Sequence, residues 1–222
     1  MNSVIGEILP LAIAVAISPI PVIAAVLMLL SPRARVTSVA FLLGWILGVA
    51  VVVTLFTLLS GVLPQSEDGP SVVASVIKIV LGALLLLLAI GQWRKRPRGD
   101  ETPAMPKWMS AIDSMTGVRA GLLGLALSAV NPKNLLMALT AGLAIGSAGL
   151  SAGEETIVIV IFVVLAVVTV AVPVIGYLVA SDRLRQPLDD VRVWLTANNA
   201  VVMAVLLAVI GVVTIGKGIA GL

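Results

Sequence analysis

Six long apolar segments alternate with short polar connections along the chain. A helix needs about 20 predominantly apolar residues to cross a hydrocarbon core of roughly 30 Å, and each segment meets that requirement. The fold class that this pattern predicts is all-α and integral to a membrane. The predicted membrane-spanning helices cover residues 5–30, 38–60, 71–93, 118–145, 156–180 and 198–216.

Charge divides the connections into two kinds. Basic residues follow the first, third and fifth segments, within 33–35, 94–107 and 183–192, whereas acidic pairs at 67–68 and 154–155 follow the second and fourth. Because cytoplasmic loops of membrane proteins carry an excess of Lys and Arg, the odd-numbered connections are expected on the cytoplasmic side. This topology places both termini outside the cell.

The third connection divides a single membrane domain, 1–222, into two halves. Residues 94–117 are rich in Pro, Arg and Lys and predict a basic cytoplasmic linker between a first half, 1–93, and a second half, 118–222. Each half has three helices, an odd number, so the two halves must lie in opposite orientations. The sequence therefore predicts two inverted three-helix repeats, a plan used by many transporters.

Proline interrupts the first and fourth predicted helices at matching depth. Pro19 and Pro132 each lie 14 residues after the start of their segment, about 21 Å along the helix. A proline inside a helix removes a backbone donor and frees a carbonyl one turn earlier, and Pro21 adds a second interruption. Two interpretations remain open. The prolines are simple kinks, or together with the neighbouring Ser18 and Asn131 they form a shared central site.

Lys133 is the only ionisable side chain near the middle of a predicted span. A charged Lys at the bilayer centre costs about 2.5 to 3.5 kcal/mol, so this residue should face the bundle interior or water. It either receives an anionic substrate group or takes part in coupling, or it is a structural residue held by the carbonyls that the prolines free. The candidate site for substrate binding or translocation comprises Ser18, Pro19, Pro21, Asn131, Pro132, Lys133 and Asn134.

The other intramembrane lysines lie near helix ends. Lys78 and Lys217 are close to the outer ends of the third and sixth segments, where long side chains can reach the interface. No acidic residue lies in the central part of a predicted span, which argues against carboxylate proton relays and against a site for a hard cation.

Composition excludes several function classes. Hydrophobic residues make up 60% of the chain and charged residues 11%, with a net charge of +3 that topology explains without nucleic acid. The sequence has no Cys and no His, which excludes disulfides, thiol redox chemistry, CxxC zinc sites, haem ligation and histidine-based acid/base catalysis. We therefore expect no catalytic residue, cofactor or bound metal, and a protein that is not an enzyme.

Four motifs together resemble one family. They are Ser-Pro-Ile-Pro at 18–21, Ser-Pro-Arg-Ala-Arg at 31–35, Phe-Leu-Leu-Gly-Trp at 41–45 and Ser-Ala-Val-Asn-Pro-Lys-Asn at 128–134. In this order they resemble the GAP family of actinobacteria, whose members are called peptidoglycolipid or sulfolipid addressing proteins. That family belongs to the lysine exporter (LysE) superfamily. The resemblance covers the whole chain and implies six helices, a plasma-membrane location and delivery of glycolipids to the cell envelope.

Three functions compete on these grounds. The leading hypothesis is a transporter or accessory export factor for lipid or glycolipid cargo, with a lateral opening beside Pro19 and Pro132. Its partners would be a larger envelope-lipid export complex or a second copy of the chain. The superfamily equally permits a small-solute exporter of amino acids, which would have a closed and more polar cavity. A non-transporting membrane scaffold, the third hypothesis, predicts that Lys133 can be replaced without loss of function.

Overall fold

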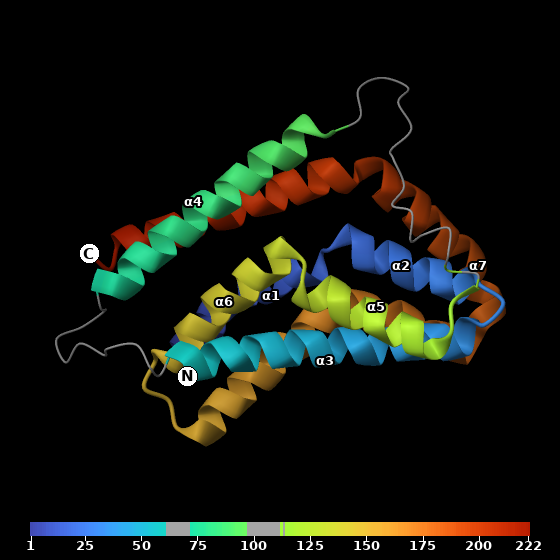
Figure 1. Cartoon of the computed structure of the whole chain (residues 1–222), viewed down its shortest axis with the longest axis horizontal. Coiled ribbons are helices and arrows are strands. Elements are labelled where there is room, and N and C mark those ends of the chain that lie inside the picture. The colour runs from blue at the N-terminus through green and yellow to red at the C-terminus, as the bar shows by residue number, and fades with distance from the viewer. Residues whose placement is uncertain (61–71, 97–111, 113) are drawn as a thin grey trace.

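The computed structural model describes residues 1–60, 72–96, 112 and 114–222, and the regular structure within them is helical. The acidic pair at 67–68 and most of the basic linker lie outside the described residues. The helices are α1 (Asn2–Ala16), α2 (Pro19–Leu30), α3 (Ala34–Ser60), α4 (Val72–Arg94), α5 (Gly117–Ala129), α6 (Pro132–Gly146) and α7 (Ala152–Ile219) (Figure 1).

Several of these helices are long and apolar enough to cross a membrane. Four qualify alone, namely Ala34–Ser60, Ser75–Arg94, Ala152–Ala180 and Gln186–Ile219. The pairs α1 with α2 and α5 with α6 add two more if each bent pair is one span. The described part of the chain thus holds four to six candidate spans, as expected of an all-helical, multi-pass membrane protein.

The two bent pairs are the helices that the prolines were predicted to break. The axis turns by 50° between α1 and α2 and by 62° between α5 and α6. Pro19 and Pro132 each begin the second helix of a pair, where a missing backbone N–H costs no hydrogen bond. The preceding Ser18 and Asn131 are extended, with ψ of 101° and 118°, because a following proline disfavours the helical conformation. Both predicted breaks are confirmed.

α7 differs from the prediction of two spans joined by a loop. Helix runs from Ala152 to Ile219, and Ala180 alone has non-helical angles within it (φ −143°, ψ 53°). The expected loop before residue 198 is therefore wrong. Its sequence places Leu188, Val191 and Leu195 on one helical face, so the connection is an amphipathic helix in spite of its charges.

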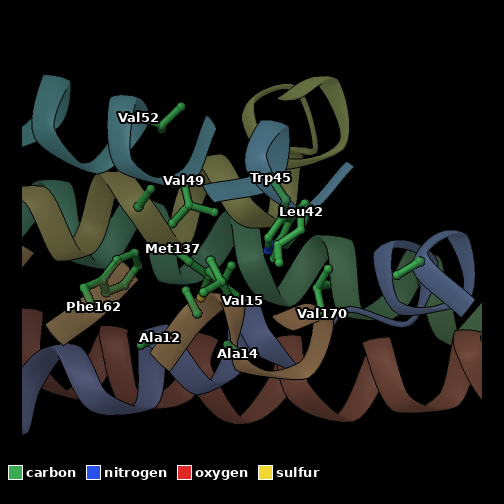
Figure 2. Packing of buried hydrophobic residues seen from close by; sticks show 14 of the residues in the cluster. Ala12, Ala14, Val15, Leu42, Trp45, Val49, Val52, Met137, Phe162 and Val170 are labelled. Atoms are coloured by element: carbon green, nitrogen blue, oxygen red, sulfur yellow. The ribbon is translucent and has the colours of Figure 1, made fainter. Parts of the chain in front are cut away.

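Helices from the two halves interlock around one core. α3 lies along α5 and α6, while α7 packs against α1, α2 and α4 (Figure 1). Figure 2 shows Val15 of α1, Trp45 of α3, Met137 of α6 and Phe162 of α7 among the core side chains. Each of the four is at most 1% exposed. Val15, which precedes the last residue of α1, is thus part of this core next to the first break.

Glycine lets α3 and α5 approach closely. A Cβ added to Gly44 would overlap the carbonyl of Gly121, and a Cβ added to Gly124 would overlap the carbonyl of Phe41. Small residues at such a contact bring two helix backbones together, which is a common mode of helix packing in membranes.

The outer surface of α3 is apolar. Leu43, Leu47, Val51 and Leu58 are between 53% and 67% exposed and recur at helical spacing. Such a stripe would be unusual on a soluble monomer, but it is the surface that a membrane-spanning helix presents to lipid.

Candidate functional site

The end of α1 and the start of α6 meet at Lys133. Its side chain is 2% exposed, and its Nζ donates to the carbonyl of Ala14 at 2.5 Å and to that of Ile17 at 3.4 Å. Among the described residues it has no carboxylate within ion-pair distance. No group of three or more Asp or Glu side chains that could hold a metal ion occurs in that part of the chain. The backbone alone compensates the buried ammonium.

The two carbonyls are available because of the break. The backbone N–H of Ser18 donates to the carbonyl of Ala16, at 2.8 Å, and so leaves Ala14 without the helical partner it would otherwise have. Pro21 has no N–H, so the carbonyl of Ile17 also lacks a helical donor. The ammonium of Lys133 satisfies both acceptors, which in an apolar interior would be costly to leave unpaired.

Two asparagines shape the second break. The Oδ1 of Asn131 accepts from the backbone N–H of Lys133 at 3.0 Å and caps α6. Asn134 is 2% exposed, and its Nδ2 donates to the carbonyl of Leu127 at 3.2 Å, near the end of α5. The Oδ1 of Asn134 is buried without a hydrogen-bond partner. An unsatisfied acceptor therefore lies next in sequence to the buried cation.

A cavity of about 650 Å³ adjoins the first break, between α2 and α7. Ser18 and Thr169 bring hydroxyl groups to its described lining, which is otherwise apolar; the Thr169 hydroxyl is already used, since it donates to the carbonyl of Ala16. Val172 both lines the cavity and is 62% exposed, so the cavity opens onto the surface of the molecule. The lining residues are Ala16, Ile17, Ser18, Pro19, Val22, Val26, Val168, Thr169, Val172, Pro173, Gly176, Leu184, Leu188, Val191 and Leu195.

The predicted site residues divide between these two places. Ser18 and Pro19 line the cavity, whereas Pro21, Asn131, Pro132, Lys133 and Asn134 do not. This cavity therefore adjoins the first break, and Pro132 is not among its lining residues. Ile17 joins the two places, because it lines the cavity and its carbonyl accepts from Lys133.

The cavity also contains residues that were not predicted from the sequence. Thr169 is the first polar residue in the apolar run after Thr156, which is a signal that a polar contact is needed there. Leu184, Leu188 and Leu195 come from the helical connection that was expected to be a loop. The spacing of these leucines indicates an amphipathic helix, but the charged residues between them favoured the prediction of a loop.

Comparison with known protein families gives a match over most of the chain. A family model described as Sap, sulfolipid-1-addressing protein, matches residues 8–220. No curated protein and no solved structure matches the chain. The matched range includes both helix breaks, Lys133 and every residue that lines the cavity of α2 and α7. Since the match spans nearly the whole chain, the protein belongs to the sulfolipid-1-addressing protein family.

Proposed function

We propose that the protein delivers a glycolipid across the plasma membrane to the cell envelope, as the transporter itself or as an accessory subunit of a larger export complex. The observation that carries this proposal is the cavity of about 650 Å³ between α2 and α7, which is apolar and open to the surface. Such a lining suits an alkyl chain, whereas a small polar solute requires several convergent polar groups. The family description agrees with a lipid cargo.

Lys133 supplies the polar half of the proposed mechanism. At rest its ammonium is held by the carbonyls of Ala14 and Ile17. An anionic head group that entered at the break could replace these carbonyls, because a charged acceptor forms a stronger hydrogen bond with an ammonium. The alkyl chains would meanwhile stay in the cavity on the far side of Ile17.

The inverted repeat belongs to the same proposal. α3, from the first half, packs on the broken pair α5 and α6, while α7, from the second half, packs on the broken pair α1 and α2. This exchange is what two inverted repeats would produce, and it would let one half rock against the other around a fixed site. We further propose membership of the LysE superfamily, both termini outside, and no enzymatic activity.

Lipid analysis of a deletion strain tests the function. Surface and interior lipids are compared in the parent, the deletion strain and the deletion strain carrying the intact gene. The proposal expects a glycolipid to accumulate inside the deletion strain and to return to the surface on complementation. Unchanged lipids together with altered amino-acid efflux would instead identify a small-solute exporter.

A further inference from the structure

Three charged side chains meet near the ends of α1, α4 and α7. The Nζ of Lys78 lies 3.4 Å from Oε1 of Glu7, and the Nζ of Lys217 lies 3.5 Å from the same oxygen. The sequence predicted that both lysines simply reach the membrane interface. The structure instead brings them to one shared carboxylate, and we call Glu7, Lys78 and Lys217 the lysine pair cluster.

The lysine pair cluster carries an excess positive charge. Two ammonium groups share one carboxylate, so the three side chains sum to +1. The N–O distances exceed the roughly 2.7 to 2.9 Å of a strong charge-assisted hydrogen bond, and Oε1 of Glu7 has no hydrogen-bond partner. Because an ammonium has three donors, both lysines keep donors available for a second anion.

A cavity gives such an anion access to the lysine pair cluster. Its volume is about 460 Å³, and the lining residues are Ser3, Gly6, Glu7, Ser75, Lys78, Lys217, Ala220 and Gly221. The side chains of Lys78 and Lys217 are 23% and 38% exposed, so both are accessible without being fully solvated. Partial burial strengthens an ion pair relative to one in bulk water.

We propose that the lysine pair cluster binds a tetrahedral oxyanion, a sulfate or phosphate group, and that it receives this group from a lipid head group. Glu7 lies five residues after the start of α1, about 8 Å along the helix, which is a depth that head groups reach. Under the predicted topology this is the outer side, so the cluster would hold the head group after transfer. The lipid source and the side rest on the proposed function, whereas oxyanion binding itself does not.

Glu7 separates this proposal from a purely structural ion-pair cluster. If Glu7 competes with an incoming anion for both ammonium groups, its neutralisation strengthens oxyanion binding. If the three residues only tie α1, α4 and α7 together, its neutralisation loosens the structure and creates no binding. Glu7→Gln therefore gives opposite results under the two interpretations.

The first measurement uses free anions. Thermal unfolding of the purified full chain in detergent is followed as sodium sulfate or sodium phosphate is added, with sodium chloride at equal ionic strength as the reference. We expect saturable stabilisation by sulfate and by phosphate. Lys78→Gln and Lys217→Gln should each weaken binding about tenfold, because each removes a charged hydrogen-bond donor. Glu7→Gln should strengthen it about threefold, and Lys95→Gln, directly after the opposite end of α4, should leave it unchanged.

The second measurement identifies the source of the anion. The protein in nanodiscs is given a sulfated glycolipid or the same glycolipid without sulfate, and retained lipid is counted by native mass spectrometry. The proposal expects preferential retention of the sulfated lipid, reduced by Lys78→Gln. Binding of free sulfate without this preference would overturn the head-group role. Sulfate binding that is unaffected by both lysine variants, or that is lost in Glu7→Gln, would overturn the site itself, whatever the deletion strain shows.

Discussion

Lys133 is stabilised by the backbone and not by an opposite charge. Its Nζ donates hydrogen bonds to two carbonyls at the end of α1. These carbonyls have no helical donor because the helix is broken there. The burial of Lys133 and its dependence on freed carbonyls were predictable, because a midplane ammonium needs acceptors and prolines supply them. The identity of the acceptors was not, since it depends on Ser18 N–H bonding to Ala16, a detail of three-dimensional geometry.

Replacing Lys133 by Met should abolish export and leave the protein folded. The substitution leaves two buried carbonyls unpaired, at about 1 to 3 kcal/mol each, but it also removes an ammonium whose burial costs a similar amount. We therefore expect export below a tenth of the parental rate and nearly unchanged expression and thermal stability. The checks are surface lipid analysis and unfolding of the purified variant.

Lys133→Arg makes the same test more specific. A guanidinium keeps the charge but is larger and planar, so it cannot occupy the position of a compact ammonium against two carbonyls. We expect partial export, between the parent and Lys133→Met. Lys95→Met, at an exposed position directly after α4, is the matched control and should export normally. Parental export by Lys133→Met would make Lys133 a structural residue.

At the scale of elements, the breaks were easier to predict than the cavity. Both α2 and α6 begin at a proline that follows a polar residue. This pattern can be recognised in the sequence without any tertiary information. The cavity between α2 and α7 depends on how α7 bends at Ala180 and brings its amphipathic part back toward α2. No local pattern in the sequence specifies that bend.

Filling the cavity should block transport without unfolding the protein. Val172 lines the cavity and is 62% exposed, so a Trp there can enter the cavity without displacing the core. We expect Val172→Trp to reduce surface glycolipid at least fivefold. Val164 lies two turns earlier, is 58% exposed and does not line the cavity, so Val164→Trp should be neutral. Equal export by both variants would show that transport does not use the cavity.

The close contact of α3 and α5 predicts a large effect of a single methyl group. A Cβ at Gly124 would overlap the backbone of Phe41, so Gly124→Ala should push the helices apart and destabilise the fold by about 1 to 3 kcal/mol. A Cβ added to Gly91 would meet no neighbouring atom within 4 Å. Gly91→Ala should therefore leave the stability of the fold unchanged or raise it by up to about 1 kcal/mol. Thermal unfolding in detergent distinguishes the two, and equal melting temperatures would contradict the packing.

At the scale of the whole molecule, the charge pattern predicts an orientation that labelling can measure. Because the chain has no native cysteine, single cysteines report their own side of the membrane. Lys95→Cys should react only after the cell is made permeable, whereas Gly153→Cys should react with an impermeant thiol reagent in intact cells. External labelling at position 95 would reverse the topology.

Hydropathy predicted apolar helices of membrane-spanning length, and the structure has four to six candidate spans, because lipid imposes a similar length on every span. They did not predict which distant residues meet. Glu7 pairs with Lys78 and Lys217 across sequence separations that no periodicity connects. Long-range contacts of this kind depend on the packing of α1, α4 and α7, which the sequence pattern leaves open.

The central claim is that exported lipid occupies the cavity between α2 and α7, and crosslinking in living cells tests it most directly. A photoreactive amino acid is placed at position 172, which lines the cavity, or at position 164, which lies on the same helix and does not line it. The lipids captured at each position are then identified by mass spectrometry. We predict that position 172 captures the glycolipid that accumulates in the deletion strain, enriched over position 164, which captures bulk phospholipid. The same lipid composition at both positions would contradict the account.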